Sequence, residues 1–205
     1  MDFYNKYNED RKVFHRFFID NKKVLAIIII ISISCLLGYW RYWYNQYNDA
    51  MLSASSTWQQ VNTDLVDQPN QQHLSAAQNF SNANNNNYGA LISIELARQF
   101  VEKGDFAVAE KQLQKALGQT RDLNLQSIIN LRIARVQLQQ KNIKGALKTL
   151  DGVKGEEWGV LAEHIRGDAE VMKSDHQAAR VAYEKALQST LLSPIARMKL
   201  NNLSN

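Results

Sequence analysis

Gly104-Asp105-Phe106-Ala107-Val108-Ala109 is a short polar turn that leads into an alanine-rich helical sequence. Similar stretches follow as Asn142-Ile143-Lys144-Gly145-Ala146 and as Ser174-Asp175-His176-Gln177-Ala178-Ala179. Their final alanines lie 37 and then 33 residues apart, and a long helical pattern precedes each turn. Internal similarity at a nearly constant period is typical of arrays in which each repeat is one pair of helices. The spacing therefore predicts three helical hairpins in a row.

Small residues recur where the two helices of each predicted hairpin must cross. Ala97, Ala134 and Gly167 take this place in the first helices, and the final alanines of the three turns take it in the second helices. A single hairpin cannot bury its own apolar faces, so we expect the units to stack. Ser193-Pro194 is typical of a helix start and predicts a final helix over residues 195–203 that caps the array. Together these features favour an all-α, tetratricopeptide-like solenoid.

One uncharged run, residues 24–40 with the sequence VLAIIIIISISCLLGYW, predicts a transmembrane helix. At a rise of 1.5 Å per residue it covers roughly 25 Å, close to the ~30 Å of the hydrocarbon layer. Lys22-Lys23 flank it on one side, and the sequence YWRYWY at residues 39–44 provides an aromatic belt on the other. These flanks argue against a buried core helix, and Leu36-Leu37-Gly38 offers no cleavage site for a signal peptide. We therefore expect residues 24–44 to anchor the protein.

Lys and Arg are distributed unevenly around this anchor. Residues 1–23 hold six of them, whereas none occurs between Arg41 and Arg98. Because such residues stay on the cytoplasmic side, we expect a cytoplasmic tail at 1–23 and a domain on the non-cytoplasmic side of the membrane beyond the anchor, in a single-pass type II arrangement. The tail also carries Phe14, Phe17 and Phe18, so an amphipathic helix lying on anionic headgroups stays open as an alternative to a purely topogenic role.

Residues 45–88 predict connecting helices and a loop between the anchor and the repeats. Apolar residues at spacings of three and four continue the first helix to about residue 66, where Asp67-Gln68-Pro69-Asn70 ends it. A short helix over residues 73–83 follows. The asparagine run at 84–87 then predicts a loop, because Asn side chains compete for their own backbone. The repeat domain with its capping helix is assigned to residues 89–205.

No pattern of residues typical of catalysis, metal binding or cofactor binding stands out. The four histidines fall in separate segments without metal-ligand spacing, and the single cysteine, Cys35, lies in the apolar run. Glu156 and Glu157 are adjacent, so on a helix they diverge by about 100° rather than converge as an acid–base pair. The formal charge of +4 is mild and spread out, which argues against nucleic-acid binding. We expect a non-enzymatic protein in contact with membrane lipid and protein partners.

The first helices of such an array line its concave face, and alignment of the turns places twelve residues there. Apolar rows mixed with guanidiniums favour an extended hydrophobic client segment or a partner helix over the carboxylate of a chain end. The alternative is that these side chains pack on residues 45–85 or on the final helix. The candidate groove residues are Leu91, Ile94, Arg98, Val101, Ile128, Leu131, Arg135, Leu138, Leu161, His164, Asp168 and Met172.

Several stretches resemble the YfgM family, the ancillary subunits of the bacterial SecYEG translocon. They are YGALISIELARQFV at 88–101, NLRIARVQ at 130–137, ALKTL at 146–150, KGEEW at 154–158 and KLNNL at 199–203. The likeness extends over nearly the whole chain and includes the short charged tail and the single anchor that ends in an aromatic cluster.

This resemblance implies a bacterial inner-membrane protein that associates with the SecYEG translocon and with a membrane-tethered periplasmic chaperone of the prolyl-isomerase type (PpiD-like). It further implies a role in passing translocated proteins to periplasmic chaperones. A second function stays open, in which the repeats act as a cell-envelope coordinator or stress-response regulator through other protein–protein interactions. Crosslinking from the anchor helix distinguishes the two.

Overall fold

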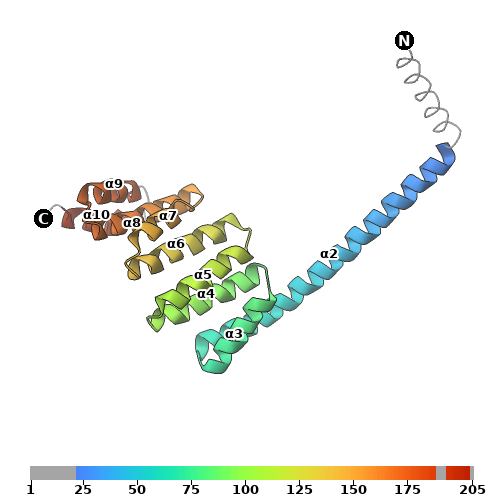
Figure 1. Ribbon diagram of the computed structural model, residues 1–205, viewed down its shortest axis with the longest axis horizontal. Helices are drawn as coiled ribbons and strands as arrows, with labels where there is room; N and C mark the ends of the chain where they lie inside the picture. The colour runs from blue at the N-terminus through green and yellow to red at the C-terminus, as the bar shows by residue number, and fades with distance from the viewer. Residues whose placement is uncertain (1–21, 188–192, 204–205) are drawn as a thin grey trace, which may run out of the picture. The chain divides into compact units, whose positions relative to one another are not determined.

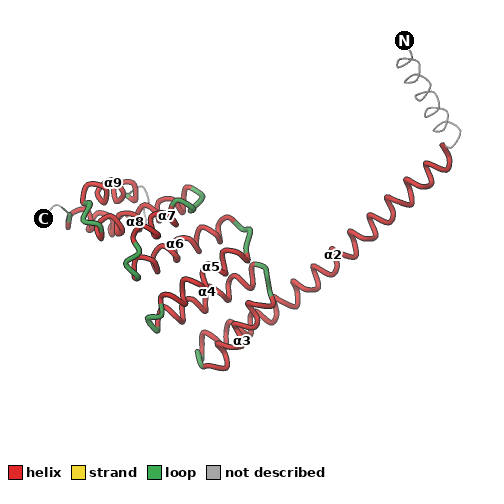
Figure 2. The backbone as a smooth tube through the Cα atoms, viewed as in Figure 1, coloured by secondary structure: helices red, strands yellow, loops and turns green. Residues whose placement is uncertain are grey.

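Helices account for the regular secondary structure in residues 22–187 and 193–203, the part of the chain that the computed structural model describes (Figure 1). Figure 2 shows short loops between these helices and no strand in the same residues. The all-α class predicted from the sequence is therefore confirmed. Two compact units, Met1–Ser53 and Ala54–Asn205, divide the chain. Most of the expected cytoplasmic tail, with its alternative amphipathic helix, lies outside the described residues.

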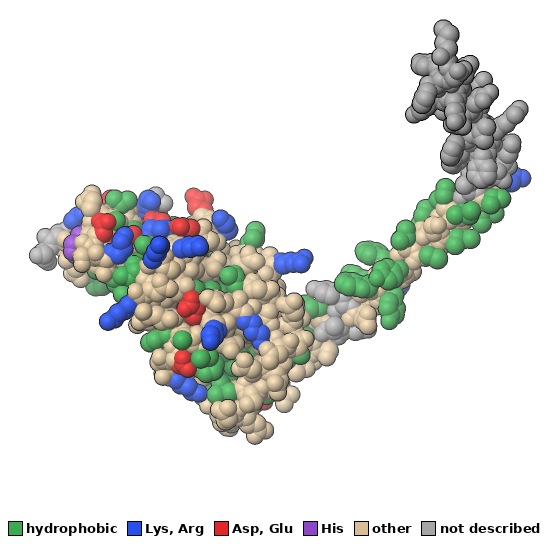
Figure 3. Space-filling model, in the orientation of Figure 1, with side chains coloured by type: hydrophobic (Ala, Val, Ile, Leu, Met, Phe, Trp, Pro, Cys, Tyr) green, Lys and Arg blue, Asp and Glu red, His purple; other side chains and the backbone are tan. Residues whose placement is uncertain are grey.

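Helix α2 (Lys22–Asp67) supplies the described part of the first unit, where its apolar side chains are exposed. Figure 3 shows hydrophobic side chains along this part of the helix. Among the described residues, α2 is the one helix long and apolar enough to cross a membrane, judged by length and composition. The hydroxyls of Ser32 and Ser34 donate to the carbonyls of Ile28 and Ile30 at 2.8 Å, so the helix itself satisfies them. A helix with exposed apolar side chains and internally bonded hydroxyls is suited to contact with the hydrocarbon chains of a membrane.

The second unit begins with the last turns of α2, which share an apolar cluster with α3 (Gln71–Ala83) and α4 (Asn87–Glu102). The predicted break after α2 is confirmed, because the helix ends at Asp67 and the Asn70 side chain caps α3 by accepting the amide of His73 at 2.9 Å. The buried members of the cluster are Ala54, Leu65, Ala77, Phe80, Ile92 and Leu96.

A polar network joins α3 to the first repeat. The hydroxyls of Ser81 and Ser93 lie 2.5 Å apart, and Ser93 donates to Oε1 of Gln119 at 2.9 Å. The side-chain nitrogen of Gln119, Nε2, donates in turn to the backbone carbonyls of Ser81 and Asn84, at 2.7 and 3.0 Å. Because unpaired polar groups are costly inside a protein, this network fixes α3 against α4 and α5 (Phe106–Gln119).

The asparagine run between α3 and α4 provides hydrogen bonds to both helices. The Asn84 side chain donates to the carbonyl of Phe80 at 2.9 Å, at the end of α3. The Asn86 side chain accepts the amide of Tyr88 at 3.0 Å and so caps the start of α4. The loop is one residue shorter than the sequence predicts, because Asn87 already belongs to α4.

Three helical hairpins form the array, as the period predicts. They are α4 with α5, α6 (Leu123–Gln139) with α7 (Ile143–Leu150), and α8 (Glu156–Met172) with α9 (His176–Ala186). Successive hairpins follow one another in Figure 1, and α10 (Ser193–Asn202) packs on α9 at the end of the array. The side chain of Ser193 lies outside the described residues, so its role as an N-cap stays a prediction.

The three turns of the hairpins share one geometry. The side chains of Asp105, Asn142 and Asp175 each accept the backbone amide three residues later, at 3.2, 3.0 and 3.0 Å. The residue before each cap is left-handed, with φ of 78°, 61° and 63° at Gly104, Lys141 and Ser174 respectively. Equivalent positions therefore adopt one backbone conformation although only the first of them is glycine.

Small residues let the helices of each hairpin approach closely. Ala109, Ala146 and Ala179 are fully buried, as predicted for the crossing points of the second helices. Ala97, Ala134 and Gly167 are buried in the first helices. The larger apolar side chains then form two cores, one between the first and second hairpins and one between the second and third. These cores are continuous across neighbours, which is why stacking stabilises the array.

Candidate partner-binding groove

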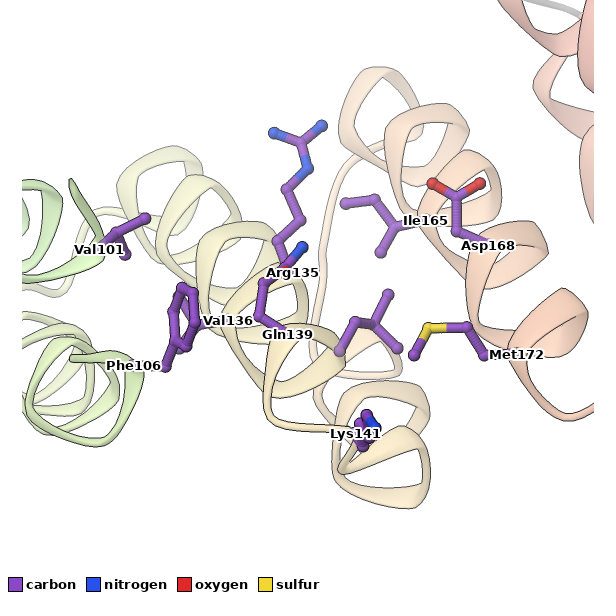
Figure 4. Close-up of a pocket in the computed structure, with 10 residues that line it drawn as sticks. Val101, Phe106, Arg135, Val136, Gln139, Lys141, Ile165, Asp168 and Met172 are labelled. Carbon is purple, nitrogen blue, oxygen red and sulfur yellow. The ribbon is translucent and has the colours of Figure 1, made fainter. Parts of the chain in front are cut away.

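An open groove with a volume of about 720 Å³ crosses helix α6 in the second unit. Figure 4 shows Val101 and Phe106 on one side of α6, and Ile165, Asp168 and Met172 on the other. The first helices of all three hairpins therefore contribute to the groove, near their C-terminal ends. Its lining residues are Val101, Phe106, Arg135, Val136, Leu138, Gln139, Lys141, Ile165, Asp168 and Met172.

The structure brings five of the twelve candidate residues together in this groove. They are Val101, Arg135, Leu138, Asp168 and Met172. The other seven lie elsewhere: Ile94 and Leu131 are in the cores between hairpins, Leu91 and Leu161 pack against those cores, Ile128 is half-buried, Arg98 is ion-paired and His164 is buried. The lining thus involves one end of the first helices rather than their whole length.

Exposed apolar side chains make this groove a candidate binding site. Val101 and Met172 are 37% and 45% exposed, and Phe106 is half-buried at the start of α5. Ile165 and Leu138 lie buried beneath them. Covering such side chains removes apolar surface from water, which stabilises a complex by about 25 cal/mol for each Å² buried. A partner that brings its own apolar side chains would therefore be stabilised here.

The N-terminal connecting helices do not supply the lining of the groove. The described turns of α2 and α3 pack instead on Ile92 and Leu96, on a different face of α4. None of the lining residues in the described part of the chain comes from α2, α3 or α10. The space over α6 is thus left open by these helices.

The final helix does engage one candidate residue, Asp168. This carboxylate accepts the hydroxyl of Tyr183 at 2.7 Å and forms an ion pair with Lys199 on α10. The Lys199 ammonium also lies 5.6 Å from the centre of the Tyr183 ring, in cation–π geometry. Burial raises the pKa of Tyr183, and Asp168 raises it further as hydrogen-bond partner and as a negative charge. Asp168 therefore has its charge compensated within the protein.

His164 lies in the protein interior rather than on the groove. It is 9% exposed, its ring lies 5.9 Å from that of Tyr183, and its Nε2 atom has no hydrogen-bond partner in the part of the chain that the structure describes. Burial lowers the pKa of His164, and the positive charges of Lys199 and Arg135 lower it further against the opposing effect of Asp168. The imidazole is thus held in its neutral form.

Cations without carboxylate partners occur along the α6 side of the groove. Arg98 on α4 is paired with Glu95 and Glu102, both at 2.5 Å. Arg135 and Lys141, by contrast, are exposed and make no ion pair with any residue that the structure describes. These two lining side chains give this side of the groove a positive charge.

Five lining residues were not predicted from the sequence. Phe106 is the first residue of α5, Lys141 lies in the turn after α6, and Gln139 is the last residue of α6. Val136 and Ile165 are mainly core residues that reach the floor of the groove. A signal was available, since Phe106 is part of the first turn sequence that the repeat alignment singles out and Lys141 directly precedes the second.

The described lining of the groove does not bring several catalytic or metal-binding side chains together. Within the residues that the structure describes, no group of three or more His, Cys, Asp or Glu side chains is placed to hold a metal ion. The ionisable residues at the groove are one compensated carboxylate and two cations, an arrangement suited to binding.

Comparison with known proteins agrees with this architecture. The family profile described as "Tetratricopeptide repeat-like domain" matches residues 15–205. An Escherichia coli (strain K12) protein named "Ancillary SecYEG translocon subunit" is 43% identical over 207 aligned positions, which cover 100% of both chains. This chain belongs to the family of ancillary SecYEG translocon subunits. The family member from Haemophilus influenzae is 34% identical over 90% of this chain and 91% of its own length, and the one from Aggregatibacter actinomycetemcomitans is 29% identical over similar shares.

Membership of the ancillary translocon subunits confirms the resemblance seen in the sequence. The relatives' names describe subunits of a translocon rather than enzymes. The family profile also covers the anchor and the connecting helices as well as the hairpins, since it begins at residue 15. The apolar helix α2 and the repeat array thus both lie within the matched family profile.

Proposed function

We propose that this protein is a non-enzymatic, membrane-anchored adaptor of the SecYEG translocon that helps to hand translocated proteins to periplasmic chaperones. The observation that carries the proposal is the open groove over α6, whose exposed Val101 and Met172 suit an apolar partner segment. The names of its relatives support the translocon as the assembly it joins. A membrane-tethered prolyl-isomerase-like chaperone is the proposed second partner.

The proposed location is the inner membrane, with residues 1–23 in the cytoplasm, 24–44 across the bilayer, and 45–88 and the repeats of 89–205 in the periplasm. The exposed apolar side chains of α2 support the membrane span, and the excess of Lys and Arg in residues 1–23 supports the orientation. Alkaline phosphatase fused after Asn205 is active only outside the cytoplasm, so an active fusion is expected. An inactive fusion that accumulates at normal levels would refute the orientation.

In-cell photo-crosslinking of the full-length protein tests the adaptor function. A photo-reactive amino acid is placed in the anchor at Leu37, in the groove at Met172, and at Leu123 as a control that is 64% exposed away from the groove. We expect SecYEG subunits to be captured from Leu37, and a periplasmic chaperone or translocating chains from Met172. Capture from Met172 that does not exceed capture from Leu123 would contradict the groove as the site.

The same experiment addresses the second function, that of an envelope coordinator or stress-response regulator. Consistent recovery of envelope-synthesis or signalling proteins from Leu37, together with the absence of translocon subunits, would favour it. The groove is compatible with either kind of partner, so the anchor position is the decisive one.

A further inference from the structure

We infer that the groove over α6 recognises extended partner segments in which acidic side chains stand beside apolar ones. This inference deepens the proposed function and rests on it, because it names the chemistry of the chain that the groove holds. Apolar side chains supply the floor, and Arg135 and Lys141 supply the only ionised groups of the lining that lack an internal counter-charge among the described residues.

In the described part of the chain, the charges at the groove are paired within the protein except on its cationic side. Asp168, the carboxylate of the lining, is already bound by Lys199, and on the neighbouring helix α4 Glu95 and Glu102 are bound by Arg98. Arg135 is exposed and has no carboxylate partner among the residues that the structure describes. A carboxylate brought by a ligand therefore meets an available guanidinium, and a cationic ligand meets no available carboxylate among the lining residues.

The cations near the groove also act on neighbouring titratable groups. Partial desolvation lowers the pKa of Arg132, one turn before Arg135 on α6, and the charges of Arg135 and Arg98 lower it further against the opposing effect of Glu95. The charges of Lys199 and Arg135 act in the same direction on the buried His164. At His164 the cations outweigh Asp168, so net positive charge disfavours protonation of this ring, and a ligand carboxylate at Arg135 would offset that charge.

The groove has a shape that suits a chain crossing α6. Figure 4 shows Arg135 between the side chains of the first hairpin and those of α8. The groove passes across α6 and has apolar contacts on both sides of it, from Val101 and Met172. A chain that crosses α6 can therefore place apolar side chains on either side and an acidic side chain at Arg135, which favours an internal segment over a chain end.

A matched peptide series and full-length protein in detergent test this inference. The reference is a short fluorescent peptide that alternates Leu and Glu and has an amidated C-terminus. The comparison peptides carry Gln or Lys in place of Glu, or Ser in place of Leu. One of the Gln peptides keeps a free C-terminal carboxylate. We expect the Leu–Glu peptide to bind roughly tenfold or more tightly than the Gln and Ser peptides, with an affinity that falls as salt is added.

Charge reversal identifies the residue responsible. Arg135→Glu is expected to lose roughly tenfold in affinity for the Leu–Glu peptide and to gain affinity for the Leu–Lys peptide, a gain that misfolding does not produce. Arg121→Glu, an exposed position in the α5–α6 turn outside the groove, is the matched control and should bind as the unmodified protein does.

Three results would overturn the inference: equal binding of the Leu–Glu and Leu–Gln peptides, binding that requires the free C-terminal carboxylate, and an unchanged order of affinities in Arg135→Glu. The proposed function has its own readout in crosslinking from Met172, which does not depend on peptide charge. Crosslinks without charge preference would therefore remove this inference and leave the adaptor function in place.

Discussion

Gly167 on α8 lies directly against the ring of Tyr183 on α9: a methyl group added at Gly167 would be 2.3 Å from Cε1 of that ring. The same Tyr183 donates its hydroxyl to Asp168 and lies beneath Lys199, so it has little freedom to move. The close approach of the third hairpin thus depends on the absence of one methyl group.

Gly167→Ala is expected to destabilise the protein by about 1–3 kcal/mol, because the added carbon overpacks a ring held by its own hydrogen bond. The matched control is Gly159→Ala in the same helix, where an added methyl group meets nothing within 4 Å. That substitution should be neutral or stabilising by up to about 1 kcal/mol, since alanine favours a helix. Chemical denaturation of both variants measures the difference, and equal stabilities would contradict the packing.

The left-handed position before each cap predicts opposite effects in two hairpins. Gly104→Ala should cost about 1–2 kcal/mol, because φ is 78° there while no atom lies close enough to clash. Ser174→Gly should stabilise by about 1 kcal/mol or less, since φ is 63° and glycine adopts it freely. Thermal unfolding tests both changes. A stabilising Gly104→Ala would mean that the turn is not left-handed in solution.

The buried His164 predicts a pH dependence of stability. Because the folded-state pKa lies below the usual value of about 6.5, folding favours the neutral imidazole. As pH falls below about 6.5, the unfolded chain binds a proton that the folded chain resists, so the free energy of unfolding decreases with acidification. The charged and titratable groups around it are Arg135, Asp168, Tyr183 and Lys199.

His164→Gln should therefore flatten the loss of stability between pH 7 and pH 5. Denaturant titrations across this range provide the measurement, and His176→Gln, at an exposed position on α9, is the control that should keep the original slope. An identical slope in the unmodified protein and in His164→Gln would show that this buried ring is not the group that titrates.

Replacing candidate residues of the predicted concave face by Asp should separate folding from binding. Leu131 and Leu138 are 6% and 8% exposed in the core between the second and third hairpins, so Asp at either position should cost several kcal/mol and unfold the array. Met172→Asp, at an exposed position on the groove, should keep the unfolding temperature within a few degrees and lose partner capture. Circular dichroism with crosslinking from Val101 distinguishes the two effects. Retained capture in folded Met172→Asp would argue against the groove.

The sequence predicts the hairpins well because their determinants are local. The Asp and Asn caps, the small crossing residues and the period of the turns can each be identified within a few residues. The groove is harder to predict, because its lining depends on which face of α6 remains open after the hairpins have packed. Leu131 and Leu138 illustrate the limit: both lie on the predicted face, yet close packing of the third hairpin buries them.

Long-range polar contacts are equally difficult to foresee. No local pattern indicates that Asp168 is bound by Lys199, a residue 31 positions away on the final helix. The three roles of Gln119 are hidden in the same way, because a single amide in an Ala- and Gln-rich helix looks like a solvated side chain.

Gln119 has a practical consequence for dividing this protein into pieces. A shortened version beginning at residue 89 would lack Ser81 and Asn84, and it would leave both donor positions of the Gln119 amide without their acceptors. The exposed faces of Ile92 and Leu96 would make such a fragment prone to aggregation. Soluble fragments intended for crystallography or partner screening should accordingly start no later than Ala54, where the helix that shields these side chains enters the second unit.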